Sequence, residues 1–391
     1  TIKKIIPTKI FQKIQPVYHF FLSWLAAVVY RRPSERLVVI GITGTTGKTT
    51  SVYLTAKMLE KEGYRVGYTS TAMFSDGKEE WLNDKKMTMV GRFYTQKMLK
   101  RMLAHKCQYA IIESTSEGMK QYRHRFLNYD ILVFTGLYPE HIESHGGFEN
   151  YKKAKGELFR HLKRCRTKYA DNDRRVKLRN RALSEGREQL RKLDLDRIKK
   201  TIIADLDDEH AEYFLGFWAE RKMGYTFSSS EEAHESFPEV NEILEYEPAD
   251  KGNLNFSVKS KDMQLSEYNI DMNILGSFNA ENAMNAVSVG LAENIGMDRI
   301  KQGLEEVDGI PGRLEKVDLG QNFYVVVDHA FEPHALSKTY DTLERSDYSR
   351  IIHVLGSAGG GRDVARRPKL GQLAGGRADV VIVTNEDPYD E

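Results

Sequence analysis

The chain has 391 residues, of which 40% are hydrophobic, with 58 Lys and Arg against 56 Asp and Glu. This length exceeds one ordinary hydrophobic core, so we expect two or more domains. A net charge of +2 gives no global reason for binding nucleic acid, and we expect no nucleic-acid partner. Two cysteines are too few for a disulfide framework or a four-cysteine zinc site, so we expect a reducing, cytoplasmic setting.

Residues 1–36 form a basic, aliphatic leader. Lysines alternate with apolar residues at its start, and the run HFFLSWLAAVVY at residues 19–30 is almost wholly apolar. A run of about a dozen residues is short for a membrane span, which needs roughly 20. Two interpretations stay open. One is an amphipathic helix that makes peripheral contact with the inner membrane face through residues 1–32; the other is a helix packed on the domain.

The stretch VVIGITGTTGKTTS at residues 38–51 is the strongest local signal in the chain. An aliphatic run predicts a buried strand, a break follows at Thr43-Gly44, and a helix is expected from Lys48. In this context loop amides and the helix N-terminus bind phosphate, Lys48 reaches the terminal phosphates, and the Thr49 hydroxyl can ligate Mg²⁺. Residue 42 is Ile where the general phosphate loop has glycine, so this is the shorter form T-G-T-x-G-K-T.

Strands and helices alternate beyond this loop. Helical spacing at residues 52–62 and 95–105 is interleaved with apolar strands at residues 64–70, 109–113 and 130–135. This alternation predicts an α/β fold with a parallel, doubly wound sheet whose ligands sit at the carboxyl ends of the strands. The strand at residues 109–113 ends in a glutamate, a residue type that Mg²⁺ accepts as a ligand.

The middle of the chain changes character. Residues 160–200 are dense in Arg and Lys, and we expect one or two exposed helices inserted at about residues 168–200. Residues 228–262 are polar and predict a loop with short strands, whereas residues 279–295 predict a clear helix.

Pro311-Gly312 predicts a boundary between a central domain at residues 37–311 and a smaller Rossmann-like α/β unit at residues 312–391. Three expected strands, at residues 323–328, 350–355 and 380–384, alternate with helical patterns in this second unit. The chain stops soon after the last strand, so we expect the second domain to be incomplete.

Residues 135–159, TGLYPEHIESHGGFENYKKAKGELF, bring charged side chains directly after a predicted strand. By composition, Glu140, His141, Glu143 and His145 would suit a zinc site. However, they lack the fixed helical interval of a zinc-binding motif, which argues against zinc. A helix is expected from about Phe148.

These motifs together resemble the Mur ligase family, and most closely its UDP-N-acetylmuramoyl-tripeptide synthetase (MurE-type) branch. TGTTGKTT is similar to T-G-T-N-G-K-T, and ESTSEGMKQYR at residues 113–123 resembles E-V-S-S-H-G-L-x-x-x-R. Residues 135–159 resemble T-N-L-x-x-D-H-L-D-x-H-G-x-x-x-x-Y-x-x-A-K-x-x-L-F. The later segments GSFNAENAMNA, PGRLE, DHAFEPHAL and GGGRDVARRPKLG follow in the family's order.

The resemblance implies a role for each matching residue. The ATP phosphates would be held by Gly44, Thr45, Thr46, Gly47, Lys48, Thr49 and Thr50, and the rest of the nucleotide by Asn282, Arg313 and Asp328. Two Mg²⁺ ions are implied, with Thr49, Glu113, His141 and a carbamylated Lys155 as ligands. The chemistry would depend on Lys48, His141, Lys155 and Arg313. The acceptor would be held by Thr88, Thr115, Gln121 and Arg123.

The resemblance implies an ATP-dependent carboxylate–amine ligase that works through an acyl phosphate. It would add an amino acid to a UDP-N-acetylmuramoyl-peptide in peptidoglycan precursor synthesis. Two alternatives stay open: a ligase like folylpolyglutamate synthetase, which shares the loop and the lysine, and a non-catalytic ATP-binding paralogue at the membrane. The partner subunit of a lipid-amidating amidotransferase typically carries a four-cysteine zinc ribbon, which two cysteines cannot build.

Several positions depart from the family pattern. Glu117 and Phe331 replace histidines, and Arg366 replaces a lysine. Residues 1–36 leave no room for the family's N-terminal uridine-nucleotide-binding domain, which puts affinity for that end of the acceptor in doubt. The motif D-N-P-R, whose Arg grips meso-diaminopimelate, is here Glu386, Asp387, Pro388 and Tyr389. Because Tyr389 carries no charge and Asp387 is acidic, we expect an L-lysine-like amino acid to be preferred over meso-diaminopimelate.

Overall fold

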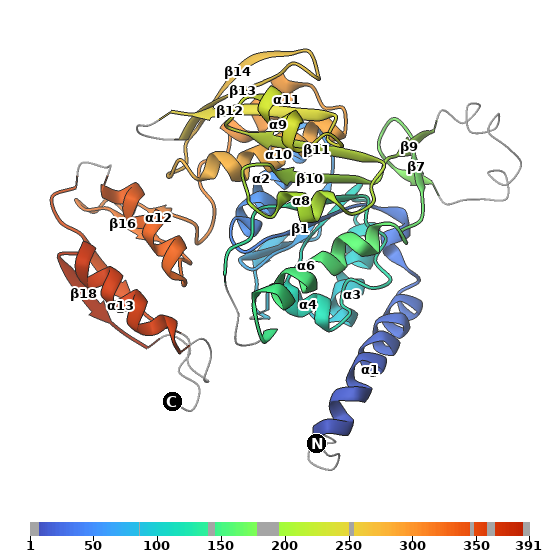
Figure 1. The fold of residues 1–391 in the computed structure, drawn as a ribbon, viewed down its shortest axis with the longest axis horizontal. Coiled ribbons are helices and arrows are strands. Elements are labelled where there is room, and N and C mark those ends of the chain that lie inside the picture. The colour runs from blue at the N-terminus through green and yellow to red at the C-terminus, as the bar shows by residue number, and fades with distance from the viewer. Residues whose placement is uncertain are drawn as a thin grey trace, which may run out of the picture.

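The computed structural model describes residues 8–85, 87–139, 145–177, 195–249, 254–344, 348–357 and 364–385. Figure 1 shows a large body that contains most of the chain, a smaller C-terminal unit beside it, and the helix α1 projecting from the body. The larger body is built on a single sheet of eleven strands.

The strand that precedes the phosphate loop, β1 (Val38–Thr43), lies in the interior of this sheet. From edge to edge the order is β14 (Leu265–Met272), β13 (Leu254–Ser260), β12 (Glu242–Pro248), β11 (Arg221–Thr226), β10 (Thr201–Asp205), β6 (Ile131–Phe134), β1, β5 (Tyr109–Glu113), β2 (Val66–Thr69), β3 (Met73–Ser75) and β4 (Glu80–Leu82). Neighbours run parallel from β12 to β2, and antiparallel strands extend both edges. The prediction of a doubly wound α/β fold is confirmed.

Helices cover both faces of the sheet because its parallel strands are apolar on both sides. Along β1, Val38 and Ile40 belong to one buried cluster and Val39 to the other. The first cluster includes side chains of α2 (Lys48–Lys61), α10 (Asn279–Ala292) and α11 (Met297–Glu305). The second includes side chains of α3 (Arg92–Ala104), α4 (Ser116–Lys120), α6 (Phe148–Leu162), α8 (Ala211–Leu215) and α9 (Ser230–Ser236). Two cores thus hold β1, and the loop after it, in place.

The described part of residues 168–200 is a three-stranded sheet, so the predicted helices are wrong there. Its strands are β7 (Lys168–Ala170), β8 (Val176–Lys177) and β9 (Asp196–Ile198); residues 178–194 lie outside the described ranges. The prediction failed because it treated all the lysines of this segment as exposed to solvent, whereas two of them are buried. Lys168 and Lys200 are buried, and their ammonium groups donate to Asp130 at 2.5 and 2.7 Å.

Asp130 is fully buried at the start of β6 and also accepts a hydrogen bond from Val39 N at 2.8 Å. Burial alone would raise the pKa of Asp130, but the charges of Lys168 and Lys200 outweigh it and hold that pKa below its usual value. One carboxylate therefore ties the small sheet to the central one.

We expect Asp130→Asn to lower the free energy of unfolding by about 3–5 kcal/mol, because it leaves two buried ammonium groups without a counter-charge. Urea unfolding followed by fluorescence would measure the change. Glu231→Gln, which removes an exposed carboxylate paired with Lys261, serves as the control and should leave the midpoint unchanged. An Asp130→Asn protein as stable as the parent would contradict this account.

Residues 228–262 are more ordered than the polar composition indicated. Their described part forms α9, β12 and β13; β12 pairs parallel with β11, and β13 and β14 then extend the sheet in antiparallel fashion. Along β13 the residues Leu254, Phe256 and Val258 are buried and alternate with more exposed neighbours. This period of two is the signal of a half-buried strand, and the high polarity of the segment concealed it.

The leader forms α1 (Thr8–Val29), followed by a short 3₁₀ helix, η2 (Pro33–Arg36). Its C-terminal half packs on the body through small side chains, Ser23, Ala26 and Ala27, and Ser23 Oγ donates to Tyr122 O at 2.9 Å. Phe20 of this helix also contacts the rings of Tyr122 and Phe126, whereas Val17, Phe21 and Trp24 are exposed. Among the described residues, no helix is both long and apolar enough to cross a membrane.

The C-terminal unit consists of two small sheets and two helices. Strand β15 (Glu315–Val317) pairs with β16 (Val325–Val327) antiparallel, and β17 (Ile352–Leu355) pairs with β18 (Val380–Val383) parallel. The helices α12 (Pro333–Glu344) and α13 (Arg366–Arg377) pack through Leu336, Tyr340 and Leu370. All three predicted strands of this unit are present.

Candidate active site

The loop between β1 and α2 requires glycine at two positions. A Cβ on Gly44 would lie 2.0 Å from Thr135 Oγ1, and Gly47 has a φ of 77°, where a side chain is strained. Gly47 directly precedes α2, so the loop delivers the chain to the N-terminus of that helix. Such a terminus carries free amides and a partial positive charge, which suits phosphate.

The segment after β6 holds the loop in its conformation. Thr45 N donates to Gly136 O at 2.8 Å, and Thr135 Oγ1 donates to Thr46 O at 2.6 Å. The hydroxyl of Thr45 accepts from Tyr138 N at 2.9 Å. Lys48 curls back over the loop, with Nζ 2.5 Å from Thr45 O. These contacts fix the loop shape before any ligand enters.

The hydroxyl of Thr49 joins the loop to two distant residues. It donates to Glu113 Oε2 at 3.0 Å and accepts from Arg313 Nη2 at 3.1 Å. The carboxylate of Glu113 also accepts from Thr71 N at 2.7 Å and from Thr71 Oγ1 at 2.9 Å. A hydroxyl beside a carboxylate is the hard oxygen donor set that Mg²⁺ prefers, so the residues present fit this ion.

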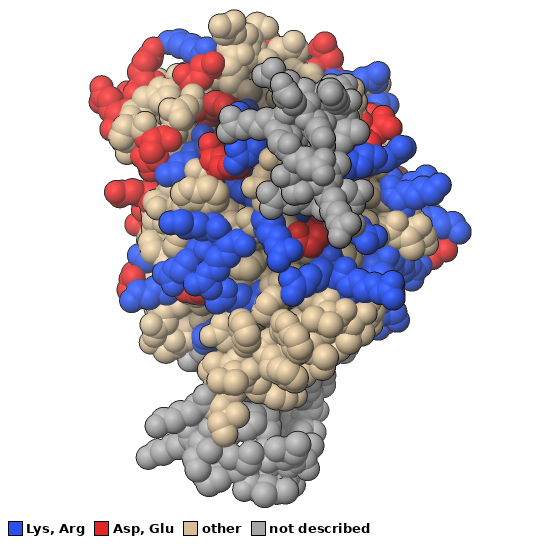
Figure 2. Space-filling model, turned by 90° about the vertical axis from the view of Figure 1, so that its right-hand side faces the viewer, with Lys and Arg blue, Asp and Glu red and all other residues tan. Residues whose placement is uncertain are grey.

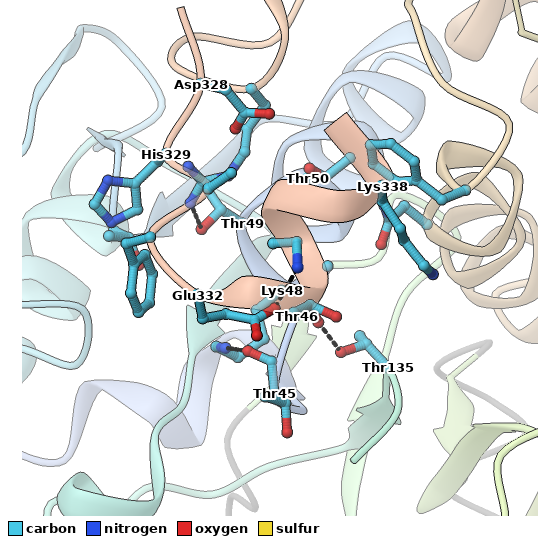
Figure 3. Close-up of a pocket in the computed structure, with 18 of the residues that line it drawn as sticks. Thr45, Thr46, Lys48, Thr49, Thr50, Thr135, Asp328, His329, Glu332 and Lys338 are labelled. Atoms are coloured by element: carbon cyan, nitrogen blue, oxygen red, sulfur yellow. Dashed lines mark hydrogen bonds between the residues drawn. The ribbon is translucent and has the colours of Figure 1, made fainter. Parts of the chain in front are cut away.

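A cavity of about 210 Å³ opens around these groups, between the central body and the C-terminal unit. Figure 3 shows Lys48 within it, with Thr45 and Thr46 of the loop on one side and Asp328 and His329 of the C-terminal unit on the other. Residues far apart in sequence therefore line one pocket.

Burial and nearby charges shift the pKa values of three groups around the pocket. Burial, with the nearby charges of Arg313, Arg366 and Lys48, lowers the pKa of His329 to about 4, so this imidazole is neutral at pH 7. Burial lowers the pKa of Arg313, although Glu113 and Asp328 oppose that shift. Burial likewise raises the pKa of Asp328, against the charge of Arg313. Cations that repel the proton of His329 attract a phosphate in the same way.

The side chain of Lys155, on α6, contacts the phosphate loop. Its side chain is 2% exposed, and Nζ donates to Gly44 O at 2.5 Å and lies 4.7 Å from the centroid of the Tyr151 ring. A lysine that is buried against the phosphate loop is placed to act there and not at the surface.

Most other residues singled out from the sequence lie in the same pocket. Asn282, Thr88 and Thr115 line it, and the Asn282 amide donates to Asn279 Oδ1 at 2.9 Å. Gln121 and Arg123 do not line this pocket. Arg123 Nη2 donates to Gln121 Oε1 at 2.7 Å, so these two predicted acceptor contacts bind each other. His141, Asp387 and Tyr389 lie outside the described residues.

Sequence reasoning missed the roles of four residues. Thr71, which holds Glu113, directly follows a predicted strand, and that position was an available signal. Thr135 was placed at the end of a strand without a role. Phe331 and Arg366, noted only as departures from a pattern, form a pair in the structure: the Arg366 guanidinium lies 5.0 Å from the centroid of the Phe331 ring.

The fold and the loop define a phosphate-loop α/β protein whose candidate site lies between two units. Residues 42–195 match the Mur ligase middle domain, and residues 312–391 match the Mur ligase glutamate ligase domain, together more than half of the chain. The chain belongs to the Mur ligase family.

Individual relatives agree with this assignment. The UDP-N-acetylmuramyl-tripeptide synthetase of Roseiflexus sp. (strain RS-1) is 32% identical over 369 residues, which cover 94% of this chain and 66% of the relative. The protein of the same name from Borreliella burgdorferi (strain ATCC 35210 / DSM 4680 / CIP 102532 / B31) is 31% identical over 95% of this chain and 65% of its own length. The chain thus spans just under two thirds of the length of these relatives.

Solved structures share the fold. A UDP-N-acetylmuramoyl-L-alanyl-D-glutamate–2,6-diaminopimelate ligase matches with a TM-score of 0.58 at 22% identity, over 90% of this chain and 62% of that one. The folylpolyglutamate synthetase of Lactobacillus casei matches with a TM-score of 0.59 at 13% identity, over 94% and 86%. At these identities the likeness concerns architecture alone.

We expect Thr49→Val to weaken binding of ATP with Mg²⁺ about 10- to 100-fold, because a hydrogen bond to a charged group contributes about 1.5–3 kcal/mol. Titration calorimetry would measure the affinity. Thr55→Val is a matched control on the same helix: Thr55 is buried and its hydroxyl has no hydrogen-bond partner among the described residues, so binding should be unchanged. Equal affinities of Thr49→Val and the parent would contradict the role of this hydroxyl.

Proposed function

We propose that the protein is an ATP-dependent ligase that joins an amine to the carboxylate of a muramoyl-peptide acceptor through an acyl phosphate. The observation that carries this proposal is the Thr49 hydroxyl, which is bonded to both Glu113 and Arg313 inside a pocket that two Mur ligase domains share. Names of the relatives, which include UDP-N-acetylmuramyl-tripeptide synthetases, support the choice of acceptor.

The chemistry requires positioning and charge neutralisation and needs no protein nucleophile. Mur ligases use ATP and Mg²⁺, which supply the phosphoryl group and the charge that activates it. In this chain the loop amides and Lys48 would hold the phosphates, and Thr49 and Glu113 would offer oxygen ligands. Arg313, reaching in from the start of the second unit, would stabilise negative charge on the transferred group. The amine of the incoming amino acid then displaces phosphate from the acyl carbon and loses a proton.

Lys48→Ala should lower ADP release about 100-fold or more and leave the melting temperature unchanged, because the charge is lost from a solvated pocket and not from a core. Lys61→Ala, at the other end of the same helix, is the control. Undiminished ADP release by folded Lys48→Ala would overturn the assignment.

The same assay identifies the substrates. ADP release is measured with UDP-muramoyl-L-alanyl-D-glutamate or a folate as acceptor, each with L-lysine or meso-diaminopimelate. We expect turnover with the muramoyl peptide and a higher kcat/KM for L-lysine. Turnover with folate alone would instead favour the folylpolyglutamate synthetase alternative, and ATP binding without turnover would favour a non-catalytic paralogue.

Lys155 is proposed to carry a carbamate. Its amine would attack CO₂, form an N–C bond and release one proton, which turns a cation into a carboxylate-like ligand for a second Mg²⁺. The burial of this side chain against the loop supports the proposal, since an ammonium group there would repel the ion. His141 is proposed as a further ligand on the family pattern.

Lys155→Ala should lose activity and regain part of it with added formate, because a free carboxylate can replace the missing ligand. Lys153→Ala, on the same helix and exposed, should behave as the parent. Incorporation of isotopically labelled bicarbonate, seen by carbon NMR, should disappear in Lys155→Ala and persist in the control. A Lys155→Ala protein with full activity would refute the carbamate.

We also propose a cytoplasmic location with peripheral contact to the inner membrane face through α1. On one stripe of this helix Val17, Phe21 and Trp24 are 68, 52 and 39% exposed, at the spacing of successive turns. The fully buried side chains of the helix, Ser23, Ala26 and Ala27, are small. A packed surface helix has the reverse arrangement, whereas an interfacial helix presents Trp and Phe to lipid.

A further inference from the structure

A second pocket lies where the end of α1 meets η2 and the end of α6, and it shares no residue with the phosphate-loop pocket. Its volume is about 300 Å³. Four arginines line it: Arg32, Arg125, Arg164 and Arg166. None of the residues expected to bind nucleotide, metal or acceptor belongs to it.

The arginines outnumber the carboxylates of the pocket: among the described residues that line it, Glu35 is the one acidic residue. Its carboxylate accepts a hydrogen bond from Asn128 Nδ2 at 2.7 Å. Within the described ranges, no carboxylate lies at ion-pair distance from any of the four guanidinium groups. Positive charge is therefore in excess around the cavity, and a bound anion would relieve the repulsion between the guanidinium groups.

Neighbouring groups respond to this excess of positive charge. His161 lines the pocket and donates from Nε2 to Leu127 O at 2.8 Å. Burial, with the charges of Arg125 and Arg164, lowers the pKa of His161 to about 4. Burial and the charge of Arg164 also lower the pKa of Arg125. The Arg125 Nε is buried and has no hydrogen-bond partner in the part of the chain that the structure describes. A donor is therefore buried and unused beside the cavity.

The pocket is continuous with the exposed helix. Phe20 of α1 is one of its lining residues, and Arg32 lies three residues after the end of that helix. Figure 2 shows the same side of the molecule: Lys and Arg form a band across the body, directly above the part of the surface that carries few charges and contains α1. Basic groups bordering an apolar, aromatic helix are complementary to an anionic bilayer, with its charged surface and hydrocarbon interior.

We infer that this arginine pocket binds the phosphate group of an anionic phospholipid while α1 lies in the bilayer surface. The inference rests on the proposed membrane contact of α1 and adds a specific ligand to it. Guanidinium groups are suited to this role because each can donate two parallel hydrogen bonds to phosphate oxygens. The lipid would thereby fix the orientation of the protein on the membrane, which an apolar helix alone cannot do.

The test is co-sedimentation of the full chain with phosphatidylcholine vesicles, with and without phosphatidylglycerol. Arg164→Gln/Arg166→Gln should weaken binding to the anionic vesicles about 30-fold, since each basic group near such a surface contributes roughly a factor of five. Arg299→Gln/Arg350→Gln changes the net charge equally at exposed positions elsewhere and should have little effect. Melting temperatures establish that each variant is folded.

A charge-conserving pair separates a pocket from a diffuse basic surface. Arg164→Lys/Arg166→Lys should still lose several-fold in affinity for the anionic vesicles, because lysine cannot make the paired contact. Binding equal to the parent would overturn the pocket and leave only general electrostatic attraction. Binding of inorganic phosphate that depends on these arginines, without any vesicle binding by the parent, would overturn the lipid and assign a soluble phosphate.

A third variant tests the premise by itself. Phe21→Ser/Trp24→Ser should reduce binding to both kinds of vesicle, whereas the arginine variants should spare binding to phosphatidylcholine alone. Unchanged binding of Phe21→Ser/Trp24→Ser would overturn the membrane contact of α1. Ligase activity measured in solution is independent of all these outcomes, so failure of the lipid site and failure of the proposed ligase function are distinguishable.

Discussion

The candidate site depends on one hydroxyl group, Oγ1 of Thr49. It can meet Glu113 because β1 and β5 are parallel and in a register that pairs Ile42 with Glu113, which brings the end of one strand level with the loop of the other. It can meet Arg313 only when the C-terminal unit is seated against the loop. The two hydrogen bonds of Thr49 Oγ1 therefore depend both on the register of the sheet and on the position of the second unit. A shift of either would separate the residues proposed to hold phosphate and metal.

Local signals were sufficient for the fold. The phosphate loop, the buried strands and the clear helix at residues 279–295 were predicted because hydrophobic period, glycine and the residues after it act over a few positions. The strands at residues 168–200 were missed for the opposite reason. The carboxylate that makes Lys168 and Lys200 buried residues lies 38 and 70 positions away from them, and composition alone made them look solvated.

In the candidate site, too, the residues with a local sequence signal were predicted, and the contacts between distant residues were not. Lys48, Thr49 and Glu113 were found from motif and strand end, and the structure places them around one cavity. Gln121 and Arg123 were taken from the family pattern, but here they bind each other beside α1, and His19 of that helix lies 3.0 Å from Arg92, which donates to Gln121 O. A motif gives the residue types at each position, but it does not show which neighbouring side chains those residues contact. Here α1 lies next to the Gln121 and Arg123 pair, and the motif could not show this.

The cluster at Asp130 has a consequence for how the chain tolerates change. Lys168, in β7, and Lys200, just before β10, both bond the carboxylate of Asp130, so the two ends of the inserted stretch are fixed to one point of the central sheet. Lengthening a segment whose ends are held together costs only about 0.6 kcal/mol for each doubling of its length. The interval between β8 and β9 is therefore suited to the grafting of a reporter domain, because the anchor at Asp130 would still hold the insertion to the central sheet.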